Sequence, residues 1–351
     1  MVETVTETLI DLILIDSSTN ADKGEIVKYA IDWLKGLGME VDIFGDKVNP
    51  AICAYNGIGG VALSGHLDTV PKGVNWTREQ GELDGGRIYG RGAADMKGAC
   101  ACMLQAAKQL MDDDLDFYVL FTTDEEVRME GAKALVKTHG AKNACGIVIG
   151  EPTSMRVAYK EKGVSSFQLR TKGKAAHASM PWLGDNAIVR MSHLLSKLND
   201  IGTSDELQNG VTFNITTING GVKNNVIPDL CEVEIDVRLP YPVRASQVEA
   251  LVHRKLKGET YDLIVPYEMP AFQTDPSSPM VRSALEQLGT APVEMPYATE
   301  AAVYCDVNKQ ILICGPGNAD LAHAADEYVE RENLERTVSL YTTLARKMVQ
   351  G

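Results

Sequence analysis

Short apolar runs and helical patterns alternate along the first part of the chain. Apolar residues recur at helical spacing over 26–37 and again over 96–111. Short apolar or alternating runs bounded by Gly, Asp or Asn predict strands at 39–44, 50–55, 61–65, 117–123 and 146–150. Towards the other end, 310–314 is a further apolar run and 334–348 is an amphipathic helical pattern. Alternating strands and helices predict an α/β domain with a mostly parallel sheet.

The middle of the chain has a different pattern. Strand and helix patterns follow one another there in the order β-α-β-β-α-β, which is typical of a small antiparallel sheet with two helices. They lie at 164–171, 185–199, 211–219, 230–238, 245–256 and 261–267. Breaks near Gly163 and around 270–279 frame the pattern. We therefore expect an α+β domain at 163–272, inserted into an α/β domain formed by 1–162 and 273–351.

Composition narrows the class of protein. The 351 residues, 44% hydrophobic and 23% charged, suffice for two domains with sizeable cores. The formal net charge of −14 argues against nucleic acid or an anionic membrane as the main partner. The seven cysteines have no CxxC spacing, as in a reducing compartment. The N-terminal segment has neither a basic leader nor an apolar run that could span a membrane, so we expect a cytoplasmic protein.

Five potential metal ligands lie where chemistry is expected in an α/β sheet. Four follow predicted strands and the last precedes a predicted helix: His66, Glu126, Glu151, His323 and Asp95. The crevice outside the carboxyl ends of the strands is the usual functional site of such sheets. Taken singly, each residue has an ordinary alternative role in a turn, a helix N-cap or a solvated loop. Together they suit two zinc, cobalt or manganese ions that share one carboxylate.

Two neighbours of these candidates have their own expected roles. Asp68 lies two positions after His66, on the same face of an extended chain. Its carboxylate could accept the second ring N–H of His66 and so fix the tautomer of a metal-binding histidine. Glu125 adjoins Glu126, and adjacent side chains of an extended segment point apart. One glutamate can therefore bind metal while its neighbour faces a substrate.

Seven sequence blocks occur in order along the chain. They are GHLDTVP, GRGAADMKG, TTDEE, GEPT, GKAAHAS followed by NAI, NNVIPD up to Arg238, and GPG followed by His323. In these blocks the chain resembles the M20 metallopeptidase and deacylase family over nearly its whole length. The resemblance implies a zinc-exopeptidase-like catalytic domain with an inserted lid and dimerisation domain. It also implies a homodimer formed through that inserted domain.

The resemblance implies roles for the candidate ligands. Asp95 would bridge two divalent metal ions, zinc in the first place, with cobalt or manganese as alternatives. His66 and Glu151 would complete the ligands of one ion, and Glu126 and His323 those of the other. Glu125 would be the general base that takes a proton from the attacking water and passes it to the leaving amine. Asp68 would support the catalytic site next to His66.

Further residues are implied to contact the substrate. His177 matches a histidine that reaches the site of the partner subunit and stabilises the oxyanion. Asn225 and Arg238 match residues that hold the substrate, and the planar fork of an arginine suits a carboxylate. Thr299 and Glu300 resemble the signature of acetylornithine deacetylases at this place. Glu300 could pair with a side-chain ammonium, the alternative being an exposed acid in a loop.

We therefore expect hydrolysis of the amide bond of an N-acyl amino acid, with N-acetyl-ornithine in amino-acid biosynthesis as the first candidate. Succinyl-diaminopimelate desuccinylase is the close alternative, and Lys160 and Lys162 could bind its extra carboxylates. Hydrolysis of acetyl-lysine or of lysine linked to a carrier protein, and M20 carboxypeptidase activity, are further alternatives. A metal-free, non-catalytic binding module is the alternative from another class. The sequence leaves the acyl group and the native metal open.

Overall fold

The computed structural model describes residues 4–203, 207 and 210–349. Its chain divides into two compact units. The first consists of Met1–Lys160, Gln273–Glu294 and Thr299–Gly351, and the second of Glu161–Phe272 and Met295–Ala298. The short segment from Met295 groups with the second unit because its carbonyl oxygen accepts the backbone N–H of Lys162 at 3.0 Å.

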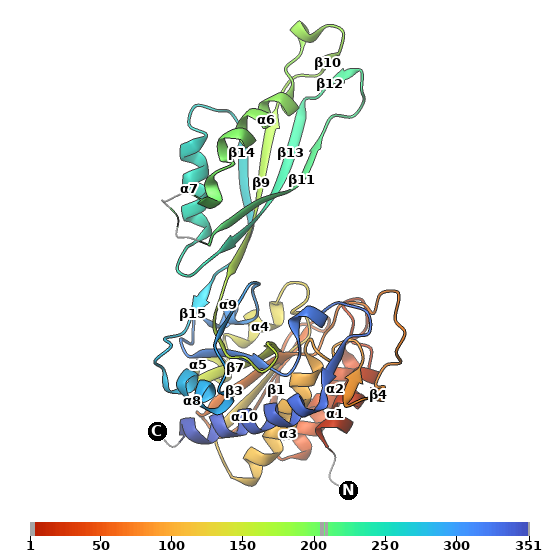
Figure 1. The fold of residues 1–351 in the computed structure, drawn as a ribbon, viewed down its shortest axis with the longest axis vertical. Helices are drawn as coiled ribbons and strands as arrows, with labels where there is room; N and C mark the ends of the chain where they lie inside the picture. Colours follow the sequence, from red (N-terminus) through yellow and green to blue (C-terminus); the bar gives the residue numbers. More distant parts are fainter. Residues whose placement is uncertain (1–3, 204–206, 208–209, 350–351) are drawn as a thin grey trace. The chain divides into compact units, whose positions relative to one another are not determined.

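The first unit is built on a mixed sheet whose central strands are parallel (Figure 1). The strand order is β1 (Glu40–Gly45), β2 (Pro50–Asn56), β6 (Phe117–Thr122), β3 (Val61–His66), β7 (Gly146–Pro152), β17 (Ile311–Gly315), β8 (Ala158–Glu161) and β15 (Phe272–Gln273), with β16 (Val293–Met295) paired to β8. The pairs β6–β3, β3–β7 and β7–β17 are parallel. The outer pairs β1–β2, β2–β6 and β17–β8 are antiparallel. The mostly parallel α/β sheet expected from the sequence is thus present at the centre.

Helices cover both faces of this sheet. They are α1 (Val5–Leu14), α2 (Gly24–Gly36), α3 (Lys97–Asp112), α4 (Glu130–Leu135), α5 (His139–Asn143), α8 (Pro279–Leu288), α9 (Ala301–Tyr304) and α10 (Arg331–Val349), with a 3-10 turn at Ala319–Leu321. Phe117, Val119 and Phe121 of β6 join one buried core with α3 and α10. The alternate residue Tyr118 packs instead against His139 of α5. The period-two alternation of β6 therefore supplies apolar side chains to both layers.

A small sheet in the first unit was not expected from the sequence. It consists of β4 (Leu83–Asp84), β5 (Arg87–Tyr89) and β18 (Tyr328–Glu330), in the order β18-β5-β4. Gly85 and Gly86 both have positive φ values, 58° and 84°, as the two central residues of a tight hairpin turn require. This sheet joins the segment before Gly90 to the segment after Glu327.

The second unit, drawn in green to teal in Figure 1, has the six expected elements in the expected order. They are β9 (Gly163–Lys172), α6 (Ala187–Leu198), β11 (Thr212–Gly220), β13 (Leu230–Leu239), α7 (Ala245–Lys255) and β14 (Asp262–Met269). The strands form an antiparallel sheet in the order β11-β13-β9-β14. Apolar side chains alternate along β9 and β13 and form one core with α6 and α7. A short ladder of β10 (Ala176–His177) and β12 (Val226–Ile227) and 3-10 turns at Pro181–Leu183 and Ile201–Thr203 complete the unit.

All seven cysteines are free thiols, and six of them are buried. Burial raises the pKa of the Cys53 thiol to about 11. Such thiols are inert, because the thiolate is the reactive form. None of the helices in the described ranges combines the length and the apolar character that crossing a bilayer requires.

Candidate metal centre

The five candidate ligands meet at one edge of the central sheet. His66 is the last residue of β3, Glu151 lies near the end of β7, and Glu126 follows β6. His323 follows β17, and Asp95 lies two residues before α3. Because β6, β3, β7 and β17 run parallel, their carboxyl ends open on the same crevice. Segments that are far apart in the sequence therefore converge there.

The side chains form two groups that share Asp95. The ligand atoms of His66, Asp95 and Glu151 lie within 4.8 Å of one another, and so do those of Asp95, Glu126 and His323. Oδ1 of Asp95 is 3.2 Å from Nε2 of His66, whereas Oδ2 is 3.5 Å from Nε2 of His323. The two oxygens of one carboxylate thus face different groups, as a bridging ligand would.

Close packing against α3 brings these ligands together. A Cβ added at Gly65, just before His66, would lie 2.5 Å from Cε of Met96, the N-cap of α3, and 3.1 Å from Sγ of Cys100 in α3. A Cβ added at Gly150, just before Glu151, would lie 2.5 Å from Cβ of Ala99. Both strands can approach the helix so closely only because these positions lack a side chain.

His66 is oriented by the backbone of Asp68. Its Nδ1 lies 2.9 Å from the carbonyl oxygen of Asp68, which can only accept, so Nδ1 carries the proton and Nε2 is free to bind a metal. The sequence led us to expect the Asp68 carboxylate in this role, but its Oδ1 is 3.6 Å away. That carboxylate accepts the backbone N–H groups of Glu125 and Glu126, each at 3.2 Å. Asp68 therefore ties the loop after β6 to the end of β3.

The crowding of ionisable groups at the site shifts the pKa values of several of them. Burial raises the pKa of both Glu125 and Glu151 well above the usual range, and neighbouring carboxylates, Glu151 for the former and Asp95 for the latter, raise it further. Burial alone would lower the pKa of His66, but the neighbouring carboxylates of Asp68 and Asp95 raise it well above its ordinary value. A hydrogen bond to Glu126 raises the pKa of His323. So many acids in a buried crevice need positive charge, which a cation would supply.

The donor set fits divalent metal ions. Oε1 of Glu151 is buried without a hydrogen-bond partner in the protein and lies 3.7 Å from Nε2 of His66. A buried carboxylate oxygen without a partner lowers the stability of the fold unless a bound ligand interacts with it. Each group offers one imidazole and two carboxylates, a mixture that suits zinc and related ions. His66, Asp95 and Glu151 could hold one ion, and Asp95, Glu126 and His323 a second.

The first acid of this loop, Asp124, has a structural role. The carboxylate of Asp124 is buried and accepts the backbone N–H groups of Glu130 and Gly131, the latter at 2.9 Å. These N–H groups open helix α4, where no residue within the helix can accept them. The run of three acids thus divides into Asp124, which shapes the loop, and Glu125 and Glu126, which lie at the crevice.

Glu300 differs from the expectation of a substrate contact. Both Thr299 and Glu300 have no exposed surface. The Glu300 carboxylate accepts hydrogen bonds from the hydroxyls of Ser64, at 3.2 Å, and Thr122. Burial raises its pKa to about 7. A substrate ammonium cannot reach a carboxylate that is enclosed in this way, so Glu300 belongs to the core beneath the site.

Three other predicted site residues lie in the second unit. His177 is exposed, and its Nδ1 accepts the backbone N–H of Ser179 at 3.2 Å, so Nε2 carries the proton in the neutral ring. Asn225 is exposed, and its backbone carbonyl oxygen accepts the backbone N–H of Ala178 at 3.0 Å. Nε and Nη2 of Arg238 donate to the two oxygens of Asp236 at 2.9 and 3.0 Å. The fork expected to bind a substrate carboxylate is thus occupied by Asp236.

The sequence reasoning missed one pair of functional interest. Arg91 and Glu327 form a buried ion pair of 2.5 Å that contacts the segments carrying Asp95 and His323. Arg91 stands within the GRGAADMKG block, and Glu327 follows His323 by four residues. The closeness of Glu327 to the candidate ligand His323 in the sequence could have drawn attention to this acid. Its partner Arg91 could not be identified without the fold.

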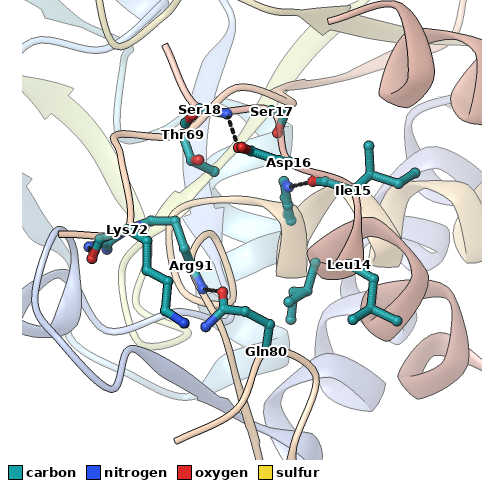
Figure 2. Close-up of a pocket in the computed structure, with 11 residues that line it drawn as sticks. Leu14, Ile15, Asp16, Ser17, Ser18, Thr69, Lys72, Gln80 and Arg91 are labelled. Carbon is teal, nitrogen blue, oxygen red and sulfur yellow. Dashed lines mark hydrogen bonds between the residues drawn. The ribbon is translucent and has the colours of Figure 1, made fainter. Parts of the chain in front are cut away.

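A separate cavity of about 240 Å³ lies beside the centre in the same unit. Figure 2 shows Leu14, Ile15 and Asp16 on one side of the cavity and Lys72, Gln80 and Arg91 on the other, while Thr69 lies next to Ser17 and Ser18. The backbone N–H of Arg91 donates to Oε1 of Gln80 at 2.8 Å, and Nζ of Lys97 donates to the carbonyl oxygen of Ile15 at 2.8 Å. The five candidate ligands are not among the residues that line this cavity.

Comparison with known proteins gives a consistent picture. The model of peptidase family M20/M25/M40 matches residues 62–347. A tripeptidase from Staphylococcus aureus has 20% sequence identity and a TM-score of 0.80, covering 99% of this chain and 98% of its own. The aminopeptidase PepT from Bacillus cereus has 20% identity and a TM-score of 0.79, covering 98% of both chains. The YXEP protein of Bacillus subtilis, described as a dinuclear metal-binding peptidase of family M20, has 18% identity and a TM-score of 0.73, covering 99% of this chain and 98% of its own.

Proposed function

Because the chain belongs to peptidase family M20/M25/M40, we propose that it hydrolyses the amide bond of a small substrate with the aid of two divalent metal ions, zinc in the first instance. The observation that carries the proposal is the Asp95 carboxylate, whose two oxygens face two separate groups of ligand atoms. The unpartnered oxygen of Glu151 supports it. A non-catalytic binding module would have no need of such a costly arrangement of buried acids.

The metal ions, Glu125 and Asp68 have separate proposed roles in the hydrolysis. Bound divalent ions would polarise the substrate carbonyl and lower the pKa of the attacking water. Glu125 stands beside the proposed ligand Glu126 and is the proposed base that takes the proton of that water; burial and the neighbouring Glu151 raise its pKa above the usual carboxyl range, the direction that a general base requires. It then gives the proton to the leaving amine. Asp68 holds the backbone N–H of Glu125 at 3.2 Å and so fixes the position of the base.

His177 is the proposed donor to the oxyanion that develops on the substrate carbonyl. The Ser179 N–H bonded to Nδ1 leaves the Nε2–H of the neutral ring as an outward donor, which supports this role. Asn225 and Arg238 are proposed to hold the substrate. For Arg238 this requires a substrate carboxylate to replace the Asp236 carboxylate at its fork.

The proposed substrate is an N-acyl amino acid, with N-acetyl-ornithine first. The support for it is the resemblance of Thr299 and Glu300 to acetylornithine deacetylases, while the burial of Glu300 removes direct pairing with an ammonium as a reason. Small peptides are the second candidate, favoured by the tripeptidase and aminopeptidase among the similar structures. The free cysteines support a reducing compartment such as the cytoplasm.

The experiment that separates these substrates is amine release by the zinc- or cobalt-loaded protein. The panel contains N-acetyl-ornithine, N-acetyl-lysine, N-succinyl-diaminopimelate, a dipeptide and a tripeptide. Fastest turnover of N-acetyl-ornithine would support the deacetylase, and fastest turnover of a peptide would replace it by a peptidase. Absence of turnover in every arm, with both ions bound, would contradict amide hydrolysis of these classes. Glu125→Gln serves as the inactive control for contaminating enzymes.

A further inference from the structure

Glu327 is a buried acid that holds the backbone of the segment carrying Asp95. Its Oε1 accepts the N–H of Ala94 at 2.8 Å and the N–H of Asp95 at 3.0 Å. The backbone N–H of Gly90 donates to the Glu327 carbonyl oxygen at 2.9 Å. The side chain has no exposed surface. The main-chain position of Asp95 therefore depends on a residue from the far end of the sequence.

Arg91 connects this acid to the segment carrying His323. Its Nη1 pairs with Oε2 of Glu327 at 2.5 Å, and its Nη2 donates to the carbonyl oxygen of His323 at 3.2 Å. The guanidinium lies 5.3 Å from the centre of the Trp76 ring, and the backbone N–H is held by Gln80 (Figure 2). Rigid contacts on several sides thus fix the arginine between two segments that each carry a candidate ligand.

The segment after β17 needs such contacts. His323 has a φ of 63° and Asp326 a φ of 55°, a left-handed conformation that residues other than glycine seldom adopt. Conformations of this kind persist only where the surroundings hold them in place. The Asp326 carboxylate accepts the backbone N–H groups of Thr77 at 2.7 Å and Arg78 at 3.0 Å. Arg91 holds the other end of the same segment at the His323 carbonyl.

We propose that the Arg91–Glu327 pair is a positioning device that sets Asp95 relative to His323 and thereby determines how tightly the Asp95–Glu126–His323 group binds its ion. The inference rests on the proposed function, since it takes Asp95 and His323 as metal ligands. Neither Arg91 nor Glu327 is a ligand itself. Contacts behind the ligands are known to control metal affinity by holding the ligands in the binding geometry.

The proposal predicts an asymmetric effect. Arg91 contacts the segment of His323, whereas His66 and Glu151 are carried by β3 and β7. Replacement of Arg91 by methionine should therefore weaken binding of the ion held by Asp95, Glu126 and His323 about 10- to 100-fold, and weaken binding of the other ion, which shares only Asp95 with that group, much less. A role in stability alone would lower the melting temperature without separating the two binding steps.

The test measures the two stepwise affinities for Co²⁺ and Zn²⁺ by competition with a chromophoric chelator. Arg91→Met leaves the buried charge of Glu327 unpaired and could prevent folding. The double variant Arg91→Met/Glu327→Gln avoids that charge and keeps an amide oxygen for the N–H groups of Ala94 and Asp95. The double variant is expected to fold, as seen by circular dichroism, and to show the same loss in one binding step.

The matched control is Arg87→Met. Arg87 pairs with Glu330 at 2.9 Å and stacks on the ring of Tyr328, so it joins neighbouring points of the same two segments. This variant is expected to bind both ions as the wild type does. Unchanged affinities in both Arg91 variants, or an equal loss in Arg87→Met, would overturn the inference while the wild type still binds two ions. A wild type that binds no ion would instead overturn the proposed function.

Discussion

At the scale of single residues, Glu125 is the group on which the proposed chemistry depends most. It is half-buried beside three other acids, and burial together with Glu151 raises its pKa well above the usual range. Glu126, its neighbour, lies 3.0 Å from Nε2 of His323 and belongs to the ligand groups. Both glutamates lie in a turn and not in the extended segment expected from the sequence, and of the two only Glu126 belongs to a group of ligand atoms.

Replacement of Glu125 by glutamine should lower kcat about 100- to 10,000-fold, the usual contribution of a general base. Metal content should stay at the wild-type level, because Glu125 is outside both ligand groups. Glu130→Gln, which alters an exposed acid paired with Lys133, is the control and should retain full activity. A Glu125→Gln enzyme with wild-type kcat would exclude this residue as the base.

The same residue sets the expected pH dependence. Only the unprotonated carboxylate can accept a proton, so kcat/KM should fall as the pH drops through the pKa of Glu125. Since that pKa is raised, the loss should set in above the ordinary range near 4.5, although bound cations would lower it from its metal-free position. A pH–rate profile of the wild type against Glu125→Asp measures this limb. A profile that is flat down to about pH 4, near the ordinary carboxyl range, would argue against the assignment.

The sequence predicted the convergence of the candidate ligands better than the contacts that support them. His66 and Glu151 lie at the carboxyl ends of strands, Glu126 and His323 follow strands, and this placement alone suggested a common crevice. The use of the Asp68 carbonyl, in place of its carboxylate, depends on local backbone geometry that spacing does not reveal. The burial of Glu300 and its bonds to Ser64 and Thr122 join residues far apart in the chain, and only the fold brings them together.

At the scale of elements, Glu300 links two strands that carry the site. Ser64 belongs to β3, two residues before His66, and Thr122 ends β6 just before the acidic loop. The Tyr304 hydroxyl of α9 lies 3.3 Å from the Ser64 hydroxyl. One buried carboxyl group and its hydroxyl donors thus connect α9 with the carboxyl ends of both strands.

The raised pKa of Glu300 makes stability depend on pH. Its pKa is about 7 in the folded protein, against 4.5 for an unperturbed glutamate, so the folded state binds the proton more tightly. The stabilisation is complete below about pH 4.5 and is lost as pH rises to about 7, an effect of about 3 kcal/mol for a fully buried group. Relative to metal-free wild type, Glu300→Gln should therefore gain stability between about pH 5 and about pH 8. A constant difference in the free energy of unfolding would refute the assignment.

Most elements followed from hydrophobic periodicity, since long strands and helices repeat their pattern several times. The helix expected over 96–111 occurs at Lys97–Asp112, for example. The hairpin of β4 and β5 has only two- and three-residue strands, too short to show a period. The Gly85-Gly86 pair is typical of a hairpin turn, but the sequence on either side showed no strand pattern that would have supported this interpretation.

At the scale of the whole molecule, the second unit offers a surface suited to a second copy of the chain. Strand β11 is an edge strand and pairs on one side with β13. Its residues are mostly exposed, among them Ile215 and Ile218, and exposed apolar residues continue on α6 at Ile188 and Val189. An exposed edge strand with apolar side chains is a template for pairing with another chain.

We accordingly expect a homodimer formed through β11. Ile218→Lys should convert it to a monomer, because a lysine on an edge strand opposes pairing. The matched control is Ile264→Lys on β14, the opposite edge of the same sheet, which should leave the dimer intact. Analytical ultracentrifugation distinguishes the two. A wild type that sediments as a monomer at micromolar concentration would refute the homodimer.

The most direct test of the central claim is the number of metal ions bound per chain. Elemental analysis after loading with zinc and gel filtration should give two ions for the wild type and fewer than one for Asp95→Ala, because that residue serves both groups. Hydrolysis should follow metal content on chelation and return on adding zinc. A wild type that holds no zinc, or that hydrolyses its substrate undiminished after complete chelation, would contradict the account.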